Sequence, residues 1–169
     1  MTKLAQVQNK IVALDEAQRL ISLWKKDNQK VVFTNGCFDI LHKGHVTYLA
    51  KAADLGDKLI VALNTDASVK AQNKGPERPI NPEDARLLVL ASLSFVDLVV
   101  LFSGETPLNE IELLQPSILA KGADYDPNET NANNKKYIVG SKEVRNYGGK
   151  VAVIDLVDGF STTAILSKR

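Results

Sequence analysis

Short, largely apolar runs alternate along the chain with segments whose apolar residues recur every three or four positions. Such runs predict buried strands at residues 30–35, 58–63, 95–102, 117–120 and 151–154. Between the first two, a helix is expected from Lys43 to about Gly56, because its apolar residues share one face. Those residues are Val46, Leu49, Ala50 and Ala53. Strands that alternate with helices predict an α/β fold, a Rossmann-like, doubly wound parallel sheet of five strands with helices on both faces.

Capping signals mark where several helices begin. Asp15-Glu16-Ala17-Gln18 resembles a capping box and predicts a helix to about Lys26. Asn81-Pro82-Glu83-Asp84 combines a cap, a proline at the first helical position and an acidic first turn. Asp66 is suited to cap a short helix, and Thr106-Pro107 to open another.

The sequence contains no internal repeat and no convincing domain boundary, so we expect a single domain over residues 1–169. Within it, a helical extension is expected over 1–28 and the core over 30–166. Two connections are predicted to be mobile loops. Residues 73–79 (NKGPERP) mix glycine, proline and charge, and residues 126–136 (DPNETNANNKK) are polar and rich in asparagine.

Composition narrows the class of protein. The 169 residues carry 21 Lys and Arg against 20 Asp and Glu, a formal charge of +1, which argues against a nucleic-acid-coating surface. Apolar runs are too short to cross a bilayer, and the polar N-terminus lacks the apolar centre of a signal peptide. The single cysteine excludes an internal disulfide and a cysteine zinc cluster. We therefore expect a cytoplasmic enzyme or binding module that engages neither membrane nor nucleic acid.

The segment from Thr34 to His45 carries the candidate chemistry, because parallel sheets bind ligands beyond the carboxyl ends of their strands. Gly36 permits a tight turn and close approach to a ligand. The following helix would point its free N–H groups at that ligand. His42 and His45 lie three apart on one side of its first turn, and Gly44 between them leaves room for a phosphate.

This pattern predicts a phosphate site, although two histidines could also be structural or form half of a metal site. Cys37 is interpreted as a small buried residue, since no chemistry here needs a thiolate. Asp39 could either bind the ligand or hold the loop by hydrogen bonds.

Gly36 to His45 fits G-x-F-D-x-x-H-x-G-H and resembles the cytidylyltransferase-like family of nucleotidyltransferases. Other segments resemble one subfamily, the adenylyltransferases that act on D-glycero-β-D-manno-heptose 1-phosphate. They are residues 63–69, 74–79, 121–125, 139–144 and 158–163, and the resemblance covers about residues 30–166. The resemblance implies the HxGH nucleotidyltransferase fold and transfer of AMP from ATP to the heptose 1-phosphate. The products would be pyrophosphate and ADP-heptose, for lipopolysaccharide core or other surface-glycan biosynthesis.

The resemblance also implies partners. Mg²⁺ is expected to arrive with ATP, held largely by phosphates and waters, and no protein ligand of the metal is assigned. Relatives tend to form homo-oligomers, so a dimer or tetramer is expected. Some relatives carry a fused sugar kinase. Because 169 residues leave no room for one, a separate kinase is expected to supply the sugar 1-phosphate.

Roles for individual residues follow from the resemblance. His42 and His45 are the catalytic pair, donating hydrogen bonds to triphosphate oxygens, with His45 nearest the α-phosphate. The expected nucleotide contacts are Thr34, Asn35, Gly36, Cys37, Phe38, Asp39, Lys121, Gly122, Ser161, Thr162 and Thr163. The expected substrate contacts are Asn64, Asp66, Lys70, Lys74, Arg78 and Arg86. For Lys70 and Lys74 a solvated surface role stays open, as does simple helix capping for residues 161–163.

One departure bears on the choice of substrate. Many cytidylyltransferases have R-T-E-G-I-S-T before the final helix, whereas Leu156, Val157 and Asp158 stand there in this chain. Without that arginine, a CTP-dependent enzyme acting on glycerol 3-phosphate is the second choice rather than the first. A non-catalytic nucleotide-binding module and a two-histidine metal protein are competing hypotheses from different classes.

Overall fold

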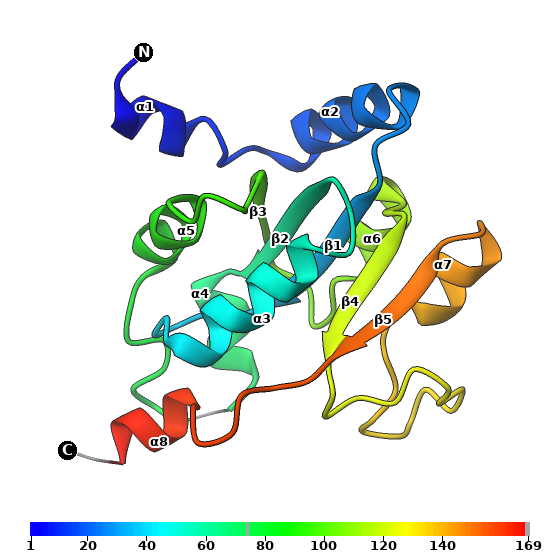
Figure 1. The fold of residues 1–169 in the computed structure, drawn as a ribbon. Coiled ribbons are helices and arrows are strands. Elements are labelled where there is room, and N and C mark those ends of the chain that lie inside the picture. Colours follow the sequence, from blue (N-terminus) through cyan, green and yellow to red (C-terminus); the bar gives the residue numbers. More distant parts are fainter. Residues whose placement is uncertain (74, 168–169) are drawn as a thin grey trace.

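Runs rich in Val, Ile and Leu form the strands, since β-branched and aliphatic side chains suit a sheet that is buried on both faces. The structure is a computed structural model that describes residues 1–73 and 75–167. Five strands run parallel in the order β3-β2-β1-β4-β5 (Figure 1). They are β1 (Val31–Gly36), β2 (Lys58–Asn64), β3 (Leu98–Phe102), β4 (Ile118–Gly122) and β5 (Lys150–Ile154). The predicted Rossmann-like sheet is therefore confirmed.

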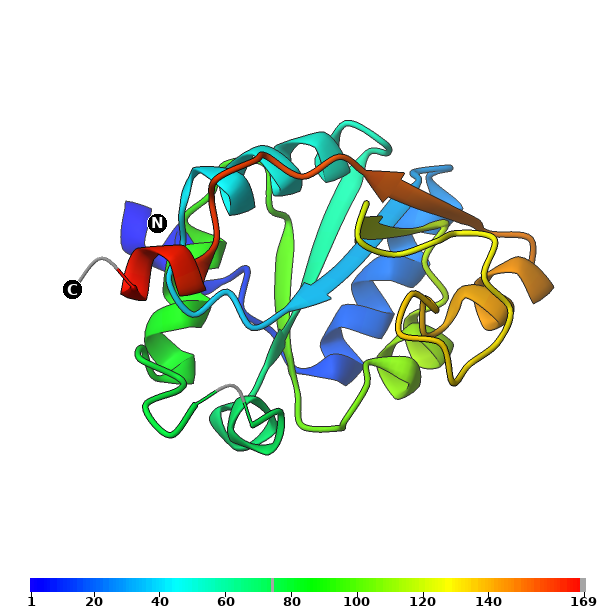
Figure 2. The same ribbon diagram turned by 90° about the horizontal axis from the view of Figure 1, so that it is seen from below.

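Helices cover both faces of this sheet, as Figure 2 shows. One core lies beneath α3 (Lys43–Ala53) and α5 (Glu83–Ala91), and the other beneath α2 (Leu14–Lys26), α6 (Leu108–Leu114) and α7 (Ser141–Asn146). The remaining helices are α1 (Lys3–Gln8), α4 (Asp66–Ala71) and α8 (Thr162–Leu166). None of the helices described over 1–73 and 75–167 has the length and apolar character to span a membrane.

The order of the strands determines where a ligand can bind. From β1 the chain moves outward through β2 to β3, and it then returns to the other side of β1 as β4. β1 pairs with β2 through Val31↔Lys58 and with β4 through Phe33↔Leu119. The crossovers leave in opposite directions at β1 and β4, which opens a crevice beyond their carboxyl ends.

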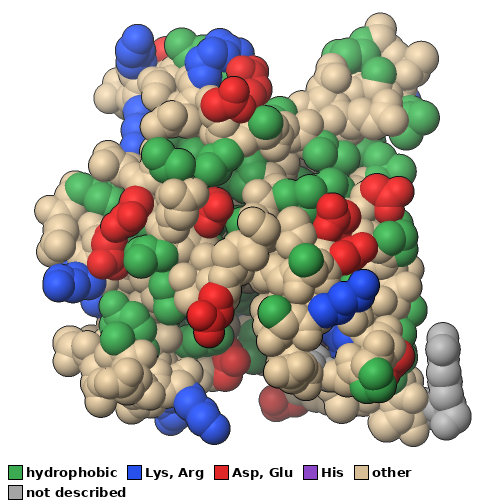
Figure 3. Space-filling view, turned by 180° about the vertical axis from the view of Figure 1, so that it is seen from behind, with side chains coloured by type: hydrophobic (Ala, Val, Ile, Leu, Met, Phe, Trp, Pro, Cys, Tyr) green, Lys and Arg blue, Asp and Glu red, His purple; other side chains and the backbone are tan. Residues whose placement is uncertain are grey.

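The segment that joins α1 to α2 covers one edge of the sheet. Ile11 bridges to Val99 in parallel, with Val99 N donating to Lys10 O at 2.8 Å and Val12 N donating to Val99 O at 3.1 Å. These bonds satisfy part of the outer edge of β3, which would otherwise offer free backbone groups to another chain. Figure 3 shows α1 and α2 as two projections with a hollow between them.

Several predicted helix and strand starts are wrong by one to three residues. Ala13, which has no side-chain cap bond, precedes α2, so Asp15 lies in the first turn and forms no capping box. Thr65 rather than Asp66 caps α4, its hydroxyl accepting from Ser68 N at 3.2 Å. Pro82 is itself the residue before α5. The third strand begins at Leu98 instead of Phe95.

The third strand starts late because residues 92–95 form turns and a bend after α5. The Asp97 carboxylate then accepts from Leu59 N at 2.8 Å and from Lys58 Nζ at 3.0 Å, which ties the chain just before β3 to the start of β2.

The segment predicted as the loop over residues 126–136 has neither helix nor strand, but its polar side chains bond to its own backbone. Asp126 Oδ1 accepts from Asn128 N at 2.8 Å, and Asn134 Oδ1 accepts from Lys136 N at 3.0 Å. Asp126 N also donates to Lys136 O at 2.9 Å, which closes the ends of the loop. The asparagines that suggested mobility therefore give this loop a defined shape.

Candidate active site

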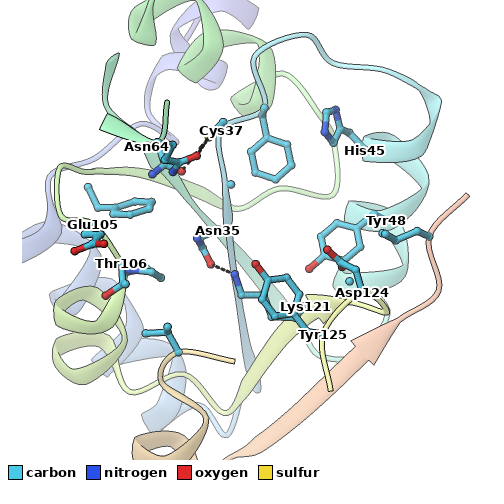
Figure 4. A pocket seen from close by; sticks show the side chains of 18 of the residues that line it. Asn35, Cys37, His45, Tyr48, Asn64, Glu105, Thr106, Lys121, Asp124 and Tyr125 are labelled. Atoms are coloured by element: carbon cyan, nitrogen blue, oxygen red, sulfur yellow. Dashed lines mark hydrogen bonds between the residues drawn. The ribbon is translucent and has the colours of Figure 1, made fainter. Parts of the chain in front are cut away.

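A cavity of about 630 Å³ opens at the carboxyl ends of the strands, where the sheet order reverses. Its wall comes from the turn after β1, the start of α3, and the segments after β2, β3 and β4, with Leu156 beyond β5 (Figure 4). Several predicted nucleotide contacts line it, namely Asn35, Gly36, Cys37, Phe38, Lys121 and Gly122, together with His45.

The turn after β1 is shaped by contacts that a larger residue at Gly36 would not allow. A Cβ there would lie 2.9 Å from Cε2 of Phe38, which itself has a positive φ of 43°. Asp39 holds the turn from outside the cavity. One of its carboxylate oxygens, Oδ1, accepts from Ile80 N and from Asn81 N, both at 2.9 Å. Of the two roles expected for Asp39, the structure therefore shows the one that holds the loop.

The two histidines stack on each other at the start of α3. His42 precedes the helix and its Nδ1 accepts from His45 N at 3.4 Å, so it serves as the cap. The ring centroids are 3.7 Å apart with an interplanar angle of 22°. A Cβ on Gly44 would come within 3.0 Å of the His42 ring and 3.2 Å of Phe160 Cβ. Close packing by His42 and Phe160 therefore favours glycine at this position.

Burial disfavours protonation of both imidazoles, and the neighbouring His42 adds repulsion at His45. Burial, helped by the neighbouring His42 charge, lowers the pKa of His45 to about 4, and the backbone of Ile40 opposes this only in part. Burial also lowers the pKa of His42. Nδ1 of His45 is buried and has no aligned hydrogen-bond partner in the described part of the chain. Two stacked neutral rings can each donate one N–H, and a nearby anion would favour their protonation.

A second cavity of about 200 Å³ lies on the other side of the histidines. His42, Gly44, Phe160, Ser161 and Thr162 line it, and it shares His45, Tyr48 and Leu156 with the larger cavity. Ser161 caps α8, its Oγ accepting from Ala164 N at 3.0 Å. Ser161 therefore caps the helix, as one of the two expectations had it, and it also lines the smaller cavity. Thr163 lies outside both linings.

Lys121 supplies the cationic side chain of the larger cavity. Its Nζ donates to Asn35 Oδ1 at 2.5 Å and lies 5.2 Å from the centre of the Tyr125 ring. Burial lowers the pKa of Lys121 to about 8, while the charge of Asp124 acts to raise it. Among the described residues that line this cavity, Lys121 is the only lysine or arginine. An anion that enters would meet it beside Asn35.

Two of the expected nucleotide contacts have other surroundings. Thr34 is fully buried, and its hydroxyl bonds to the hydroxyl of Tyr48 at 2.8 Å, so the expectation that it faces the nucleotide is wrong. Cys37 is half-buried and lines the cavity instead of lying in the core. Its thiol is within hydrogen-bond distance of Asn64 Oδ1 at 3.5 Å and of Gln72 Oε1 at 3.3 Å.

Arg86, an expected substrate contact, lines neither of the two cavities beside the histidines. It is 2% exposed, and its Nη1 donates to Cys37 O and Asn64 O, both at 2.8 Å. Its Nη2 pairs with Asp66 Oδ1 at 2.6 Å. Arg86 and Asp66 therefore fasten the ends of β1 and β2, and of the expected substrate contacts only Asn64, among the described residues, lines the larger cavity.

The other basic candidates lie apart from the histidines. Lys70 and Arg78 line a separate cavity of about 350 Å³ formed by the connection after α4. Arg78 Nε lies 2.5 Å from Asp39 Oδ2 but lacks the alignment of a hydrogen bond, so the contact is an ion pair. Lys74 lies outside the described residues.

Several cavity residues carried no functional signal in the sequence, namely Tyr48, Gln72, Glu105 and Tyr137. Thr106 was expected only as part of a helix start, and Asp124 only as part of the segment 121–125 that resembles the subfamily, without a role in the site. For Glu105, its position after a strand end would have been the one available guide. Over residues 1–73 and 75–167, the His, Cys, Asp and Glu side chains form no group of three or more that could hold a metal ion.

Comparison with known proteins identifies the family. A family model described as cytidylyltransferase-like matches residues 33–168. The chain is 52% identical over 160 residues to the bifunctional protein HldE of Magnetococcus marinus, covering 95% of this chain and 31% of that protein. It is 49% identical over 156 residues to the HldE of Gluconobacter oxydans, covering 92% and 31%. The chain thus spans about a third of the length of these curated relatives.

Solved structures share the same architecture. A lipopolysaccharide core biosynthesis protein from Thermoplasma volcanium is 27% identical with a TM-score of 0.58, covering 76% of this chain and 97% of that one. A pantoate-beta-alanine ligase from Francisella tularensis is 15% identical with a TM-score of 0.60, covering 92% and 75%. At that identity the ligase bears on the fold alone.

Proposed function

Because the chain belongs to the cytidylyltransferase-like family and is a nucleotidyltransferase, we propose that it transfers AMP from ATP to D-glycero-β-D-manno-heptose 1-phosphate. The reaction gives ADP-heptose and releases pyrophosphate. The observation that carries the proposal is that His45 lies between two cavities and lines both. The N–H of one imidazole can then donate to an oxygen of the α-phosphate, which is the phosphate that passes from one substrate to the other.

We assign the triphosphate to the histidine side of the site. His42 and His45 stand at the start of α3, where free backbone N–H groups favour an anion, and Ser161 and Thr162 face the same smaller cavity. The larger cavity would take the sugar 1-phosphate, with its anion at Lys121 beside Asn35, which reassigns to the sugar phosphate two residues that the resemblance gave to the nucleotide. The two anions would then meet at His45.

This arrangement suits a reaction that needs no general base. A sugar phosphate is already nucleophilic near neutral pH because its second pKa is about 6. The attacking phosphate oxygen forms a bond to the α-phosphorus, and the bond to the leaving pyrophosphate breaks. Fixed donors at His45 and Lys121 would hold two repelling anions in line and stabilise charge that develops on the α-phosphate.

Mg²⁺ fits this site only as an ion carried by the triphosphate. The described residues offer no cluster of three metal ligands, and a magnesium ion bound to phosphates keeps several waters and needs few protein ligands. When bound, it would neutralise phosphate charge and favour departure of pyrophosphate.

Pyrophosphate release across a small panel tests the proposal. ATP, CTP and GTP are each offered with Mg²⁺ and with the heptose 1-phosphate or glycerol 3-phosphate. We expect release with ATP and the heptose 1-phosphate, and rates lower by at least roughly 100-fold for the other pairs. Preference for CTP with glycerol 3-phosphate would favour the CTP-dependent enzyme. Nucleotide binding without release in any pair would indicate a non-catalytic module and refute the proposal.

A further inference from the structure

Tyr48 stands where the two cavities of the candidate active site meet. It follows His45 by about one turn of α3, and both side chains project from that helix toward the larger cavity (Figure 4). Like His45, Tyr48 lines both the larger and the smaller cavity. It is only 8% exposed, and its ring packs in the core beneath α3, so the direction of its hydroxyl is fixed.

The hydroxyl of Tyr48 forms a hydrogen bond with the hydroxyl of Thr34 in β1. The two oxygens are 2.8 Å apart, and either could be the donor. Thr34 is fully buried, and its hydroxyl has no other hydrogen-bond partner among residues 1–73 and 75–167. If Tyr48 donated, the Thr34 proton would be buried without an acceptor, which is costly. Donation by Thr34 avoids that cost and leaves the Tyr48 proton for a group in the cavity.

The Tyr48 hydroxyl keeps its proton near neutral pH. Burial raises the pKa of Tyr48 to about 12, the bond to Thr34 acts to lower it, and the charge of Asp124 adds to the rise. No hydrogen bond joins Tyr48 to Asp124 in the described part of the chain. The hydroxyl is therefore suited to donate a hydrogen bond to a ligand, and it is not suited to act as a base.

We propose that Tyr48 is a catalytic residue whose hydroxyl donates a hydrogen bond to an oxygen of the α-phosphate, beside the His45 imidazole. The inference rests on the proposed function, in which the α-phosphate is transferred at His45. In that step an oxygen of the sugar phosphate bonds to the α-phosphorus, and the bond to pyrophosphate breaks. A second fixed donor stabilises the charge on the remaining α-phosphate oxygens, and no proton leaves Tyr48.

Tyr48→Phe tests the proposal, because it removes the hydroxyl and keeps the ring that packs in the core. Pyrophosphate release is measured with ATP, Mg²⁺ and D-glycero-β-D-manno-heptose 1-phosphate. We expect kcat to fall by roughly 10- to 100-fold, while the KM for each substrate stays within about threefold. Thr34→Val removes the partner but leaves the Tyr48 hydroxyl, so its kcat should fall by less than about fivefold. An equal loss in the two variants would make the pair structural and overturn the inference.

Tyr147→Phe is the matched control. The Tyr147 hydroxyl donates to Pro116 O at 3.0 Å, and Tyr147 lines neither of the two cavities. The change therefore removes a tyrosine hydrogen bond away from the site and should leave kcat unchanged. Circular dichroism checks that all three variants are folded. A kcat for Tyr48→Phe as high as that of Tyr147→Phe overturns the inference.

Phosphorothioate analogues of ATP provide a measurement that a purely structural role would not change. Sulfur accepts hydrogen bonds weakly, so the diastereomer with sulfur at the oxygen that Tyr48 contacts should react slowly with the unmodified protein. In Tyr48→Phe this slowing should shrink by at least about fivefold for that diastereomer and persist for the other. Identical slowing in both proteins overturns this inference alone. Absence of pyrophosphate release by the unmodified protein with every sugar 1-phosphate overturns the proposed function and this inference with it.

Discussion

At the scale of single residues, the chemistry depends on side chains whose protonation is set by their surroundings. His45 is neutral in the free protein because burial lowers its pKa to about 4. Burial also lowers the pKa of Lys121, to about 8, so its charge is lost just above neutral pH. Both lie where anions are expected to bind, so binding and protonation should reinforce each other. Each of these residues can be tested separately.

His45→Ala should lower kcat by roughly 10²–10³, the loss expected when one transition-state donor is removed. The fold should persist, since His45 is only half-buried and its Nδ1 bonds to no described residue. Steady-state kinetics and circular dichroism measure the two effects. Cys37→Ser is the control, and it should keep most of the activity because a hydroxyl can also donate to the amide oxygens that the thiol contacts. More than a third of the normal kcat in His45→Ala would refute its role.

The alkaline limb of the pH profile should report Lys121. Because burial lowers its pKa to about 8, the charge that attracts the sugar phosphate is present below that pH and is lost as pH rises through it. For the free enzyme, kcat/KM for the sugar phosphate should therefore fall above pH of about 8. Asp124→Asn removes a charge that raises the pKa of Lys121, so the fall should begin at lower pH.

Lys121→Met provides the check on this pH profile. It should lower kcat/KM by roughly 10²-fold and remove the alkaline limb altogether. An identical limb in Lys121→Met would assign the titration to another group.

At the scale of elements, periodicity predicted the order and type of the main strands and helices, since long apolar faces follow directly from burial. The six-residue helices α1 and α7 escaped because one and a half turns show no periodic face. The HxGH turn was found from its spacing, but Glu105, on the wall of the larger cavity, was not. That wall combines polar residues from separate loops, whose proximity depends on tertiary structure.

The burial of Arg86 could not be predicted either, because the sequence does not tell a buried arginine from an exposed one. Its guanidinium joins the ends of β1 and β2 to the start of α5. Arg86→Met should therefore lower the free energy of unfolding by about 3–5 kcal/mol, as expected when a buried charged partner is removed. Urea denaturation measures the change.

Arg19→Met is the matched control for Arg86. Arg19 pairs with Glu16 at 2.7 Å on the exposed face of α2, where water screens the charges, so its loss should leave the midpoint of urea denaturation nearly unchanged. A stable Arg86→Met protein with a raised KM for the sugar phosphate would instead support the substrate contact that the sequence implied.

At the scale of the whole molecule, the strand order places every cavity-forming segment of the candidate active site at one end of the sheet. At the outer edge of the sheet, residues 10–12 bond to Val99 of β3, which reduces the backbone groups available for pairing with another chain. On the face shown in Figure 3, basic side chains are interspersed with acidic ones and do not gather into one patch. Among the described residues that line the larger cavity, positive charge is confined to Lys121.

The same three side chains, His45, Tyr48 and Leu156, line both cavities. A synthetic inhibitor that tethers an adenosine unit to a heptose through an uncleavable phosphonate bridge would therefore reach both chambers without displacing a backbone segment. Such a conjugate would enter with one loss of translational freedom instead of two, so its affinity should exceed that of either fragment by several orders of magnitude.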